Sequence, residues 1–363
     1  MIMLWTMIFV MTLKEKRNHY NVKFLKGYGH SISVKDSKII LKDCHDPFSP
    51  PFIEEWFPNR MPYEKIVLSG KGYVSTEALG MLSENNRNVI LVNSKGDIQC
   101  VMSGTKSSLT ATKYRMAQYD TFRIASKRDY LSRQVVKAKI GSQIQFLKSI
   151  ENPQVESSIE KLEKHLNDLG NNVLHAEAVT SRLYFGAFSK LIDERFKFSA
   201  RNLPMTVKKY GATDVINALL NYGYSVLSGE ISKFIHGVGL DPYFGFYHKN
   251  HTSFQSLVYD MMEPFRWLVE CAVWNISNAK SRHRISKKQY SYTRKGTVVL
   301  EYDLIKSFLE LLERTFQKER KYDYKFGLKT KDGLKSVQEI TIAKIAVQNL
   351  AEHCLGKNKN FVI

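Results

Sequence analysis

The spacing of apolar residues changes near residue 107, and this change restricts the possible fold more than any other feature of the chain. Between about residues 20 and 105, short β-branched runs alternate with turn residues, a pattern typical of strands and tight turns. Beyond residue 107 the apolar residues recur at helical spacing. The sequence therefore predicts an α+β fold, with a small β-rich N-terminal domain followed by a larger all-α domain. One stripe of a long helix consists of Leu131, Val135, Ile140, Ile144 and Leu147.

Several short segments define the predicted β-rich domain. SISVKDSKIILKD predicts two strands joined at residues 35–37, and NVILVNSKGDIQCVMSG predicts two more with a turn at 94–97. KIVLSG, residues 65–70, predicts a further strand. Ser75 fits the N-cap of one helix, STEALGMLSENN. The proline-rich segment 46–62 is predicted to be a loop, because proline cannot donate to a sheet ladder.

The N-terminus and the helical region complete the expected organisation. Residues 1–19 form an apolar extension, whose run of 13 residues is too short to span a bilayer, which takes about 20. The extension lacks the basic flank and small-residue cleavage site of a secretion signal, and Met11 is an alternative start. The β-rich domain is expected at 20–106 and the helical domain at 107–363. Individual helices are predicted at 155–169, 175–195, 212–236, 254–279, 301–318 and 336–355.

The charge balance indicates an anionic partner. Lys and Arg total 54 against 35 Asp and Glu, which gives a net charge of +19 and an isoelectric point near 9.5. Such an excess repels itself unless an anion balances it, and nucleic acid is the usual anion, ahead of a membrane surface. The four cysteines are far apart and form no CxxC pair, which argues against a zinc site or a disulfide framework. A reduced, cytoplasmic protein is expected.

The segment KSRHRISKKQYSYTRKG, residues 280–296, is the clearest candidate for contact with nucleic acid. Cations can follow a phosphate backbone, and Tyr290 and Tyr292 can stack on bases or pack against sugars. The alternative is an ordinary solvated run of charges. The candidate contact residues are Arg282, Arg284, Lys287, Lys288, Arg294 and Lys295.

Acidic residues in apolar surroundings are the second unusual feature. Asp260 and Glu263 lie three residues apart within a mostly apolar helical run, and two neighbouring acids need a cation beside them. Arg266 could supply it as a helix-surface salt bridge. A divalent metal is the other possibility, since Mg²⁺ and Mn²⁺ prefer carboxylate oxygens and Mn²⁺ also accepts an imidazole. His248, or His251 near it, could provide that imidazole.

Glu177, in the apolar helix HAEAVTSRLYFGAFSKL, raises the same question. A carboxylate there is costly to bury unless a cation holds it, and a solvated helix face is the alternative. Tyr184 and Tyr222 are expected to be core or hydrogen-bonding residues rather than nucleophiles. P-loop, HExxH and GxSxG motifs are absent from the sequence.

Taken together, these segments resemble the CRISPR-associated spacer-acquisition integrase family. LKGYGHSISVKDSKIIL and MPYEKIVLSGKGYVSTEALGMLSENNRNVILVNSKG resemble its N-terminal β-domain. EAVTSRLYFGAF resembles its Glu-containing helix, and GLDPYFGFYH followed by SLVYDMMEPFR resembles its catalytic core. The resemblance implies that Glu177, His248 and Glu263 ligate Mg²⁺ or Mn²⁺, with Asp260 as an accessory catalytic acid.

The resemblance also implies an activity and partners. DNA 3′-hydroxyl ends would be joined to target DNA by transesterification, with spacer acquisition as the first interpretation. A homodimer would form through the β-domain, and a small ferredoxin-like second CRISPR-associated protein would bridge two dimers; no membrane partner is expected. MMEPFRWLVE and the tail after about residue 320 look closer to casposon-encoded homologues, whose substrates would be transposon ends. A non-catalytic DNA-binding or architectural protein is the alternative from another class.

Overall fold

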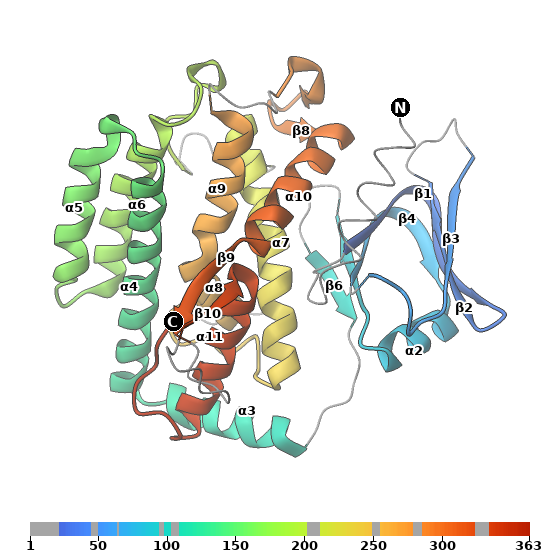
Figure 1. Ribbon diagram of the computed structural model, residues 1–363, viewed down its shortest axis with the longest axis horizontal. Coiled ribbons are helices and arrows are strands. Elements are labelled where there is room, and N and C mark those ends of the chain that lie inside the picture. Colours follow the sequence, from blue (N-terminus) through green and yellow to red (C-terminus); the bar gives the residue numbers. More distant parts are fainter. Residues whose placement is uncertain are drawn as a thin grey trace. The chain divides into compact units, whose positions relative to one another are not determined.

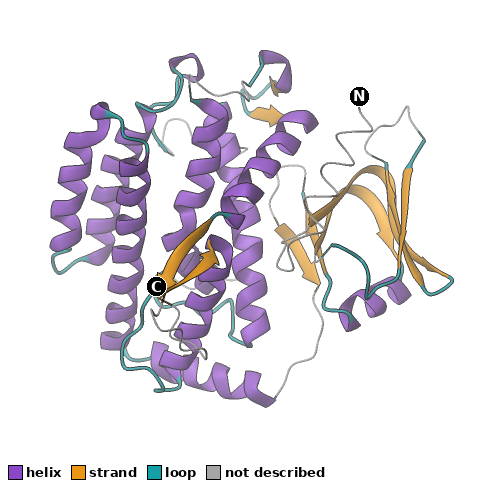
Figure 2. Ribbon diagram, viewed as in Figure 1, coloured by secondary structure: helices purple, strands orange, loops and turns teal. Residues whose placement is uncertain are grey.

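The computed structural model divides the chain into two compact units, Met1–Lys106 and Ser107–Ile363, which we describe separately (Figure 1). It describes residues 22–44, 50–63, 65–93, 98–102, 109–201, 211–248, 255–278, 285–323 and 334–363. The predicted N-terminal extension and the turn at 94–97 lie outside the described residues. Strands dominate the first unit and helices the second (Figure 2), which confirms the predicted α+β class.

The first unit is a six-stranded mixed sheet in the order β3-β2-β1-β4-β5-β6. The β1–β4 and β4–β5 pairs are parallel, and the others are antiparallel. The predicted turn is confirmed: Asp36 and Ser37 have φ of 50° and 59°, as a two-residue hairpin loop requires. Ser75 accepts a hydrogen bond from Ala78 N and caps α2 (Thr76–Glu84) as predicted. The strands are β1 (Val22–Lys35), β2 (Lys38–Asp43), β3 (Phe52–Trp56), β4 (Lys65–Val74), β5 (Asn88–Val92) and β6 (Ile98–Met102).

The proline-rich segment corrects one prediction. Residues 46–62 were expected to form a loop, but β3 lies within them, between Pro51 and Pro58. β3 is at the edge of the sheet and pairs with β2. An edge strand tolerates flanking prolines because only one side of it has to bond to a neighbouring strand.

The second unit is a helical bundle with two small hairpins. The predicted stripe of α4 is confirmed, since its five apolar residues are all buried. The predicted helix 254–279 is instead two helices, because Pro264, which has no N–H, lies in a 3₁₀ turn at Glu263–Phe265. The helices are α3 (Leu109–Phe122), α4 (Ala125–Ser149), α5 (Glu156–Asn167), α6 (Val173–Ser189), α7 (Val215–Val238), α8 (Ser256–Met262), α9 (Arg266–Ser277), α10 (Tyr302–Gln317) and α11 (Glu339–Cys354).

The two hairpins were not predicted. One pairs β7 (Tyr290–Tyr292) with β8 (Val298–Leu300), and the other pairs β9 (Glu319–Asp323) with β10 (Leu334–Gln338). In the first hairpin, β7 and the turn lie inside the basic segment discussed above, and β8 follows that segment. No helix within the described ranges is long and apolar enough to cross a membrane.

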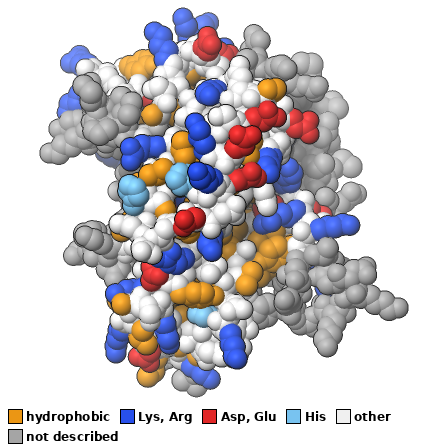
Figure 3. Space-filling view, turned by 90° about the vertical axis from the view of Figure 1, so that its left-hand side faces the viewer, with side chains coloured by type: hydrophobic (Ala, Val, Ile, Leu, Met, Phe, Trp, Pro, Cys, Tyr) orange, Lys and Arg blue, Asp and Glu red, His pale blue; other side chains and the backbone are white. Residues whose placement is uncertain are grey.

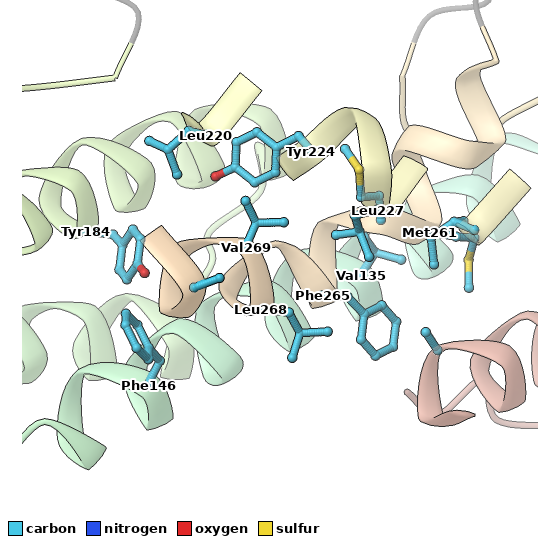
Figure 4. Close-up of a cluster of buried hydrophobic side chains, with 14 of the residues drawn as sticks. Val135, Phe146, Tyr184, Leu220, Tyr224, Leu227, Met261, Phe265, Leu268 and Val269 are labelled. Atoms are coloured by element: carbon cyan, nitrogen blue, oxygen red, sulfur yellow. The ribbon is translucent and has the colours of Figure 1, made fainter. Parts of the chain in front are cut away.

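Helix α9 lies at the centre of the second unit and packs against α4, α7 and α10. Gly223 lets α7 approach it closely, because a Cβ at this position would collide with Val269 and touch Phe308. The apolar side chains between the helices interlock as one cluster (Figure 4). Burial on this scale supplies most of the driving force for the fold and gives the polar residues described next a rigid support.

Candidate active site

Two acids from different helices share one buried ammonium group. Glu177 is on α6, Glu263 follows α8, and both contact Nζ of Lys139 on α4. The Lys139 Nζ–Glu263 Oε2 distance is 2.7 Å, and both groups are buried. Glu177 Oε1 also accepts a hydrogen bond of 2.8 Å from Ser181 Oγ. The cluster therefore consists of oxygens gathered around a cation.

The protonation states of this cluster are set by two opposing effects, burial and the charges of neighbouring residues. Burial alone would raise the pKa of Glu263, but Arg266 and Lys139 outweigh it and lower that pKa to about 2. Burial would lower the pKa of Lys139, but Glu263 and Glu177 raise it above its usual value. Glu263 and the ammonium are therefore both charged near neutral pH.

His248 lies beside Glu263 and is oriented by Asp260. Its Nδ1 is 2.7 Å from Asp260 Oδ1, and its Nε2 is 3.9 Å from Glu263 Oε1. The Asp260 carboxylate accepts at this contact, so Nδ1 carries a proton and Nε2 is on the Glu263 side of the ring. A histidine that ligates a metal is commonly held in this way by a carboxylate on its other nitrogen.

Asp260 is fully buried and also fixes the chain that precedes His248. Its carboxylate accepts the backbone N–H groups of Phe246, Tyr247 and His248 at 2.7, 3.0 and 2.8 Å. The loop passes so close to α8 that a Cβ on Gly245 would lie 2.5 Å from Asp260 Oδ2 and 2.9 Å from Ser256, so only glycine fits there. Asp260 contacts the site through His248, and its role as an accessory catalytic acid stays a prediction.

A buried series of polar contacts lies next to the cluster and supports it. Arg266 donates to Glu263 Oε1 at 2.9 Å, as predicted for this i,i+3 pair, and its guanidinium lies 4.7 Å from the centre of the Tyr224 ring. Tyr224 and Tyr184 both donate to Glu270, at 2.8 and 2.6 Å. Burial raises the pKa of Glu270 despite these donors. Both tyrosine rings lie beside the helix that carries Leu268 and Val269 (Figure 4).

The structure thus brings Glu177 and Glu263 together, with His248 next to Glu263. Within the described ranges no three Asp, Glu, His or Cys side chains form a ready-made coordination group; Lys139 lies between the two acids. Lys139 and Glu270 were not selected as site residues from the sequence. The available signal was that Lys139 falls in the buried stripe of α4, four residues after Val135. His251 lies outside the described residues.

The predicted DNA-contact residues fall on or next to the β7–β8 hairpin, except that Arg282 and Arg284 lie outside the described residues. Lys287 and Lys288 form an exposed 3₁₀ turn before β7, and Arg294 and Lys295 lie in the turn before β8. Tyr292 is 59% exposed, and its ring meets that of Tyr290 edge-on. By contrast, Figure 3 shows a face on which Lys and Arg are interspersed with Asp and Glu.

A mixed β-sheet unit followed by a helical unit is the fold that this chain shares with solved casposase and Cas1 structures. A solved "Casposase bound to integration product" shares the fold, with a TM-score of 0.80 and 24% identity over 94% of this chain and 92% of that one. A chain of a "Cas6-RT-Cas1--Cas2 complex" matches with a TM-score of 0.72 and 17% identity, over 96% of this chain and 36% of that chain.

Sequence relationships agree with the fold. The profile described as "CRISPR associated protein Cas1" matches residues 25–314. The "CRISPR-associated endonuclease Cas1 1" of Archaeoglobus fulgidus is 28% identical over 263 residues, which are 66% of this chain and 73% of the relative. The chain belongs to the Cas1 family of CRISPR-associated integrases and endonucleases.

Proposed function

We propose that the protein is a metal-dependent DNA integrase and endonuclease that joins DNA 3′-hydroxyl ends to target DNA by transesterification. The observation that carries the proposal is the convergence of Glu177 and Glu263, from separate helices, on one cation with His248 beside them. The donor set fits a divalent ion, because Mg²⁺ and Mn²⁺ take carboxylate oxygens and Mn²⁺ also takes imidazole nitrogen. Glu263 Oε2, which contacts Lys139 Nζ at 2.7 Å, is a further oxygen that such an ion could take.

Each residue of the cluster then has a distinct task. Glu177, His248 and Glu263 would hold the ion, which when bound acts as a Lewis acid on the phosphoryl group. Asp260 holds the His248 ring through Nδ1, so that Nε2 is directed toward Glu263. Arg266 fixes the Glu263 carboxylate and neutralises part of its charge. The β7–β8 residues bind the DNA backbone and so bring the scissile phosphate to the acids.

Metal removal tests this proposal. Branched DNA that carries a free 3′-hydroxyl should give strand-transfer and cleavage products with Mn²⁺ or Mg²⁺, and none in excess EDTA. DNA binding should persist in EDTA, because the basic residues supply it. A protein that binds DNA but yields no product with either metal would instead be the non-catalytic DNA-binding alternative.

Casposon integration is the second candidate, and the fold comparison favours it: the casposase has the higher of the two TM-scores, 0.80 against 0.72. The two candidates share the chemistry and differ in the DNA that is joined. Donor duplexes with transposon-end sequences should outcompete random duplexes if the protein is a casposase. Equal use of both favours spacer acquisition, for which we also propose a small second CRISPR-associated protein as partner.

We further propose that the β-sheet unit forms a homodimer. β3 is an edge strand, and large apolar side chains on it and beside it are solvent-exposed: Phe52 by 56%, Ile53 by 54% and Phe57 by 46%. An edge strand with exposed apolar side chains is normally covered in the working protein. Sedimentation equilibrium that finds only monomers at micromolar concentration would contradict this proposal.

The predicted DNA-contact residues lead to a quantitative expectation. Replacement of both Lys287 and Lys288 with alanine should weaken DNA binding. It should also reduce the slope of log K against log salt concentration by about 0.9 for each phosphate that is no longer neutralised. The double replacement of Lys161 and Lys164, which lie on α5, removes the same charge and should keep the slope. Fluorescence anisotropy at several salt concentrations measures both. Equal slopes for the two double variants would place the DNA elsewhere.

A further inference from the structure

Lys139 is the one site residue whose position has no explanation in the proposed chemistry. It occupies the apolar stripe of α4, where Val135, Val136 and Ile140 are buried, and it is itself only 6% exposed. A buried ammonium costs several kcal/mol unless anions hold it. Glu177 and Glu263 are those anions, so the three groups stabilise one another as they stand.

Two cations already balance the two acids Glu177 and Glu263 without a metal. Lys139 and Arg266 contribute two positive charges, and Glu177 and Glu263 contribute two negative ones. Asp260 adds a further buried negative charge beside His248, which its three backbone N–H donors and the His248 ring stabilise without neutralising it. A divalent ion entering beside the ammonium would place two more positive charges next to a buried cation, and their repulsion is strong at low effective dielectric.

The ammonium and the ion also need the same atoms. Lys139 Nζ contacts Glu177 Oε1 and Glu263 Oε2, one oxygen from each of the two carboxylates proposed as ligands. A cation bound by both carboxylates has to lie between them, which is where Nζ lies. We propose that Lys139 is a positioning residue that holds Glu177 and Glu263 in the metal-free protein and competes with the divalent ion for them. This inference rests on the proposed metal site.

Two consequences follow. Without metal, Lys139 prevents the two carboxylates from repelling each other, so the site keeps its shape before the ion arrives. With metal, the side chain has to release both carboxylates, so the ion binds more weakly than the ligand set alone would allow. The protein would therefore need a higher metal concentration to reach half-occupancy of the site.

Mn²⁺ binding to the full-length protein without DNA tests the inference directly. Electron paramagnetic resonance of free Mn²⁺ gives the dissociation constant. Lys139→Met should bind Mn²⁺ at least about ten-fold more tightly than the wild type, because its competitor and a nearby positive charge are gone. Lys139→Arg keeps the charge and should not tighten binding. Lys148→Met is the matched control: Lys148 lies on the same helix, is 56% exposed and pairs with Glu163, so its replacement should leave the Mn²⁺ dissociation constant unchanged.

Stability gives a second readout. In EDTA, Lys139→Met should melt at a lower temperature than the wild type, and saturating Mn²⁺ should raise its melting temperature by more than it raises that of the wild type. If the methionine variant folds only with Mn²⁺, that supports the inference; if it does not fold at all, Lys139→Gln, which is similar in length and neutral, takes its place.

Two variants distinguish a failure of the inference about Lys139 from a failure of the proposed metal site. If Glu177→Gln weakens Mn²⁺ binding while Lys139→Met binds Mn²⁺ no more tightly than the wild type, the inference is overturned and the metal site stands. If Glu177→Gln leaves Mn²⁺ binding unchanged, the proposed metal site itself is wrong, and the role of Lys139 falls with it.

Discussion

Glu177→Gln is expected to abolish metal-dependent strand transfer and cleavage while leaving the affinity for DNA almost unchanged. Glutamine keeps the size of the side chain and can still accept from Ser181, but it removes one of the two charged carboxylates proposed to bind the ion. Loss of several kcal/mol of transition-state stabilisation corresponds to a rate lower by about 10³-fold. The Glu177 side chain is 23% exposed, so the fold should tolerate the change better than it would at the buried Glu263.

Glu160→Gln is the matched control for this experiment. Glu160 is exposed on α5, and its replacement changes the net charge by the same amount at a distance from the cluster. Rates with a saturating DNA substrate and Mn²⁺, together with DNA affinity by gel shift, separate chemistry from binding. Wild-type rates in Glu177→Gln would exclude this residue from the reaction.

Asp260→Ala is expected to cost both stability and activity. The substitution leaves three backbone N–H groups and the His248 Nδ1–H without their common acceptor. Each buried donor that is left without an acceptor costs about 1–3 kcal/mol, and partial hydration limits the sum to about 3–5 kcal/mol of unfolding free energy. Because the loop that carries His248 is then no longer held, activity should fall even at temperatures where the protein stays folded.

Urea denaturation and strand-transfer rates measure the two effects of Asp260→Ala separately. Asp303→Ala is a suitable control, because Asp303 is exposed in the first turn of α10 and its replacement should cost less than about 1 kcal/mol. Asp260→Asn keeps an oxygen acceptor and should fall between the wild type and the alanine variant in both measurements. An alanine variant as stable as the wild type would mean that Asp260 does not hold the loop.

Local features of the sequence predicted the elements that depend on local physics. The turn at Asp36 and Ser37, the Ser75 cap and the buried stripe of α4 are each determined by a few neighbouring residues. The Arg266–Glu263 pair was accessible for the same reason, because residues three apart on a helix are neighbours. The β7–β8 hairpin could not be predicted, because its strands have three residues each. Such strands are too short to show a recognisable alternation of apolar and polar residues.

The candidate site was only partly predictable because its contacts join distant parts of the chain. The sequence surroundings singled out Glu177, His248, Asp260 and Glu263, and the family resemblance then gave these residues their expected roles. Lys139 meets Glu177 across 38 residues, and Tyr184 meets Glu270 across 86. Such partners depend on how the helices pack. A charged residue within an apolar stripe marks a buried ion pair, but it does not name the partner.

The hydrogen bond between Tyr184 and Glu270 also bears on how the site could adapt to different ions. Helix α6 carries both Glu177 and Tyr184, and Tyr184 connects α6 to α9 through this hydrogen bond. The first residue of α9, Arg266, binds Glu263. If α6 moved away from α9 to increase the distance between the two acids, the hydrogen bond between Tyr184 and Glu270 would break. The site can still adjust to a larger or smaller ion by rotation of the Glu177 side chain, which is more exposed than that of Glu263.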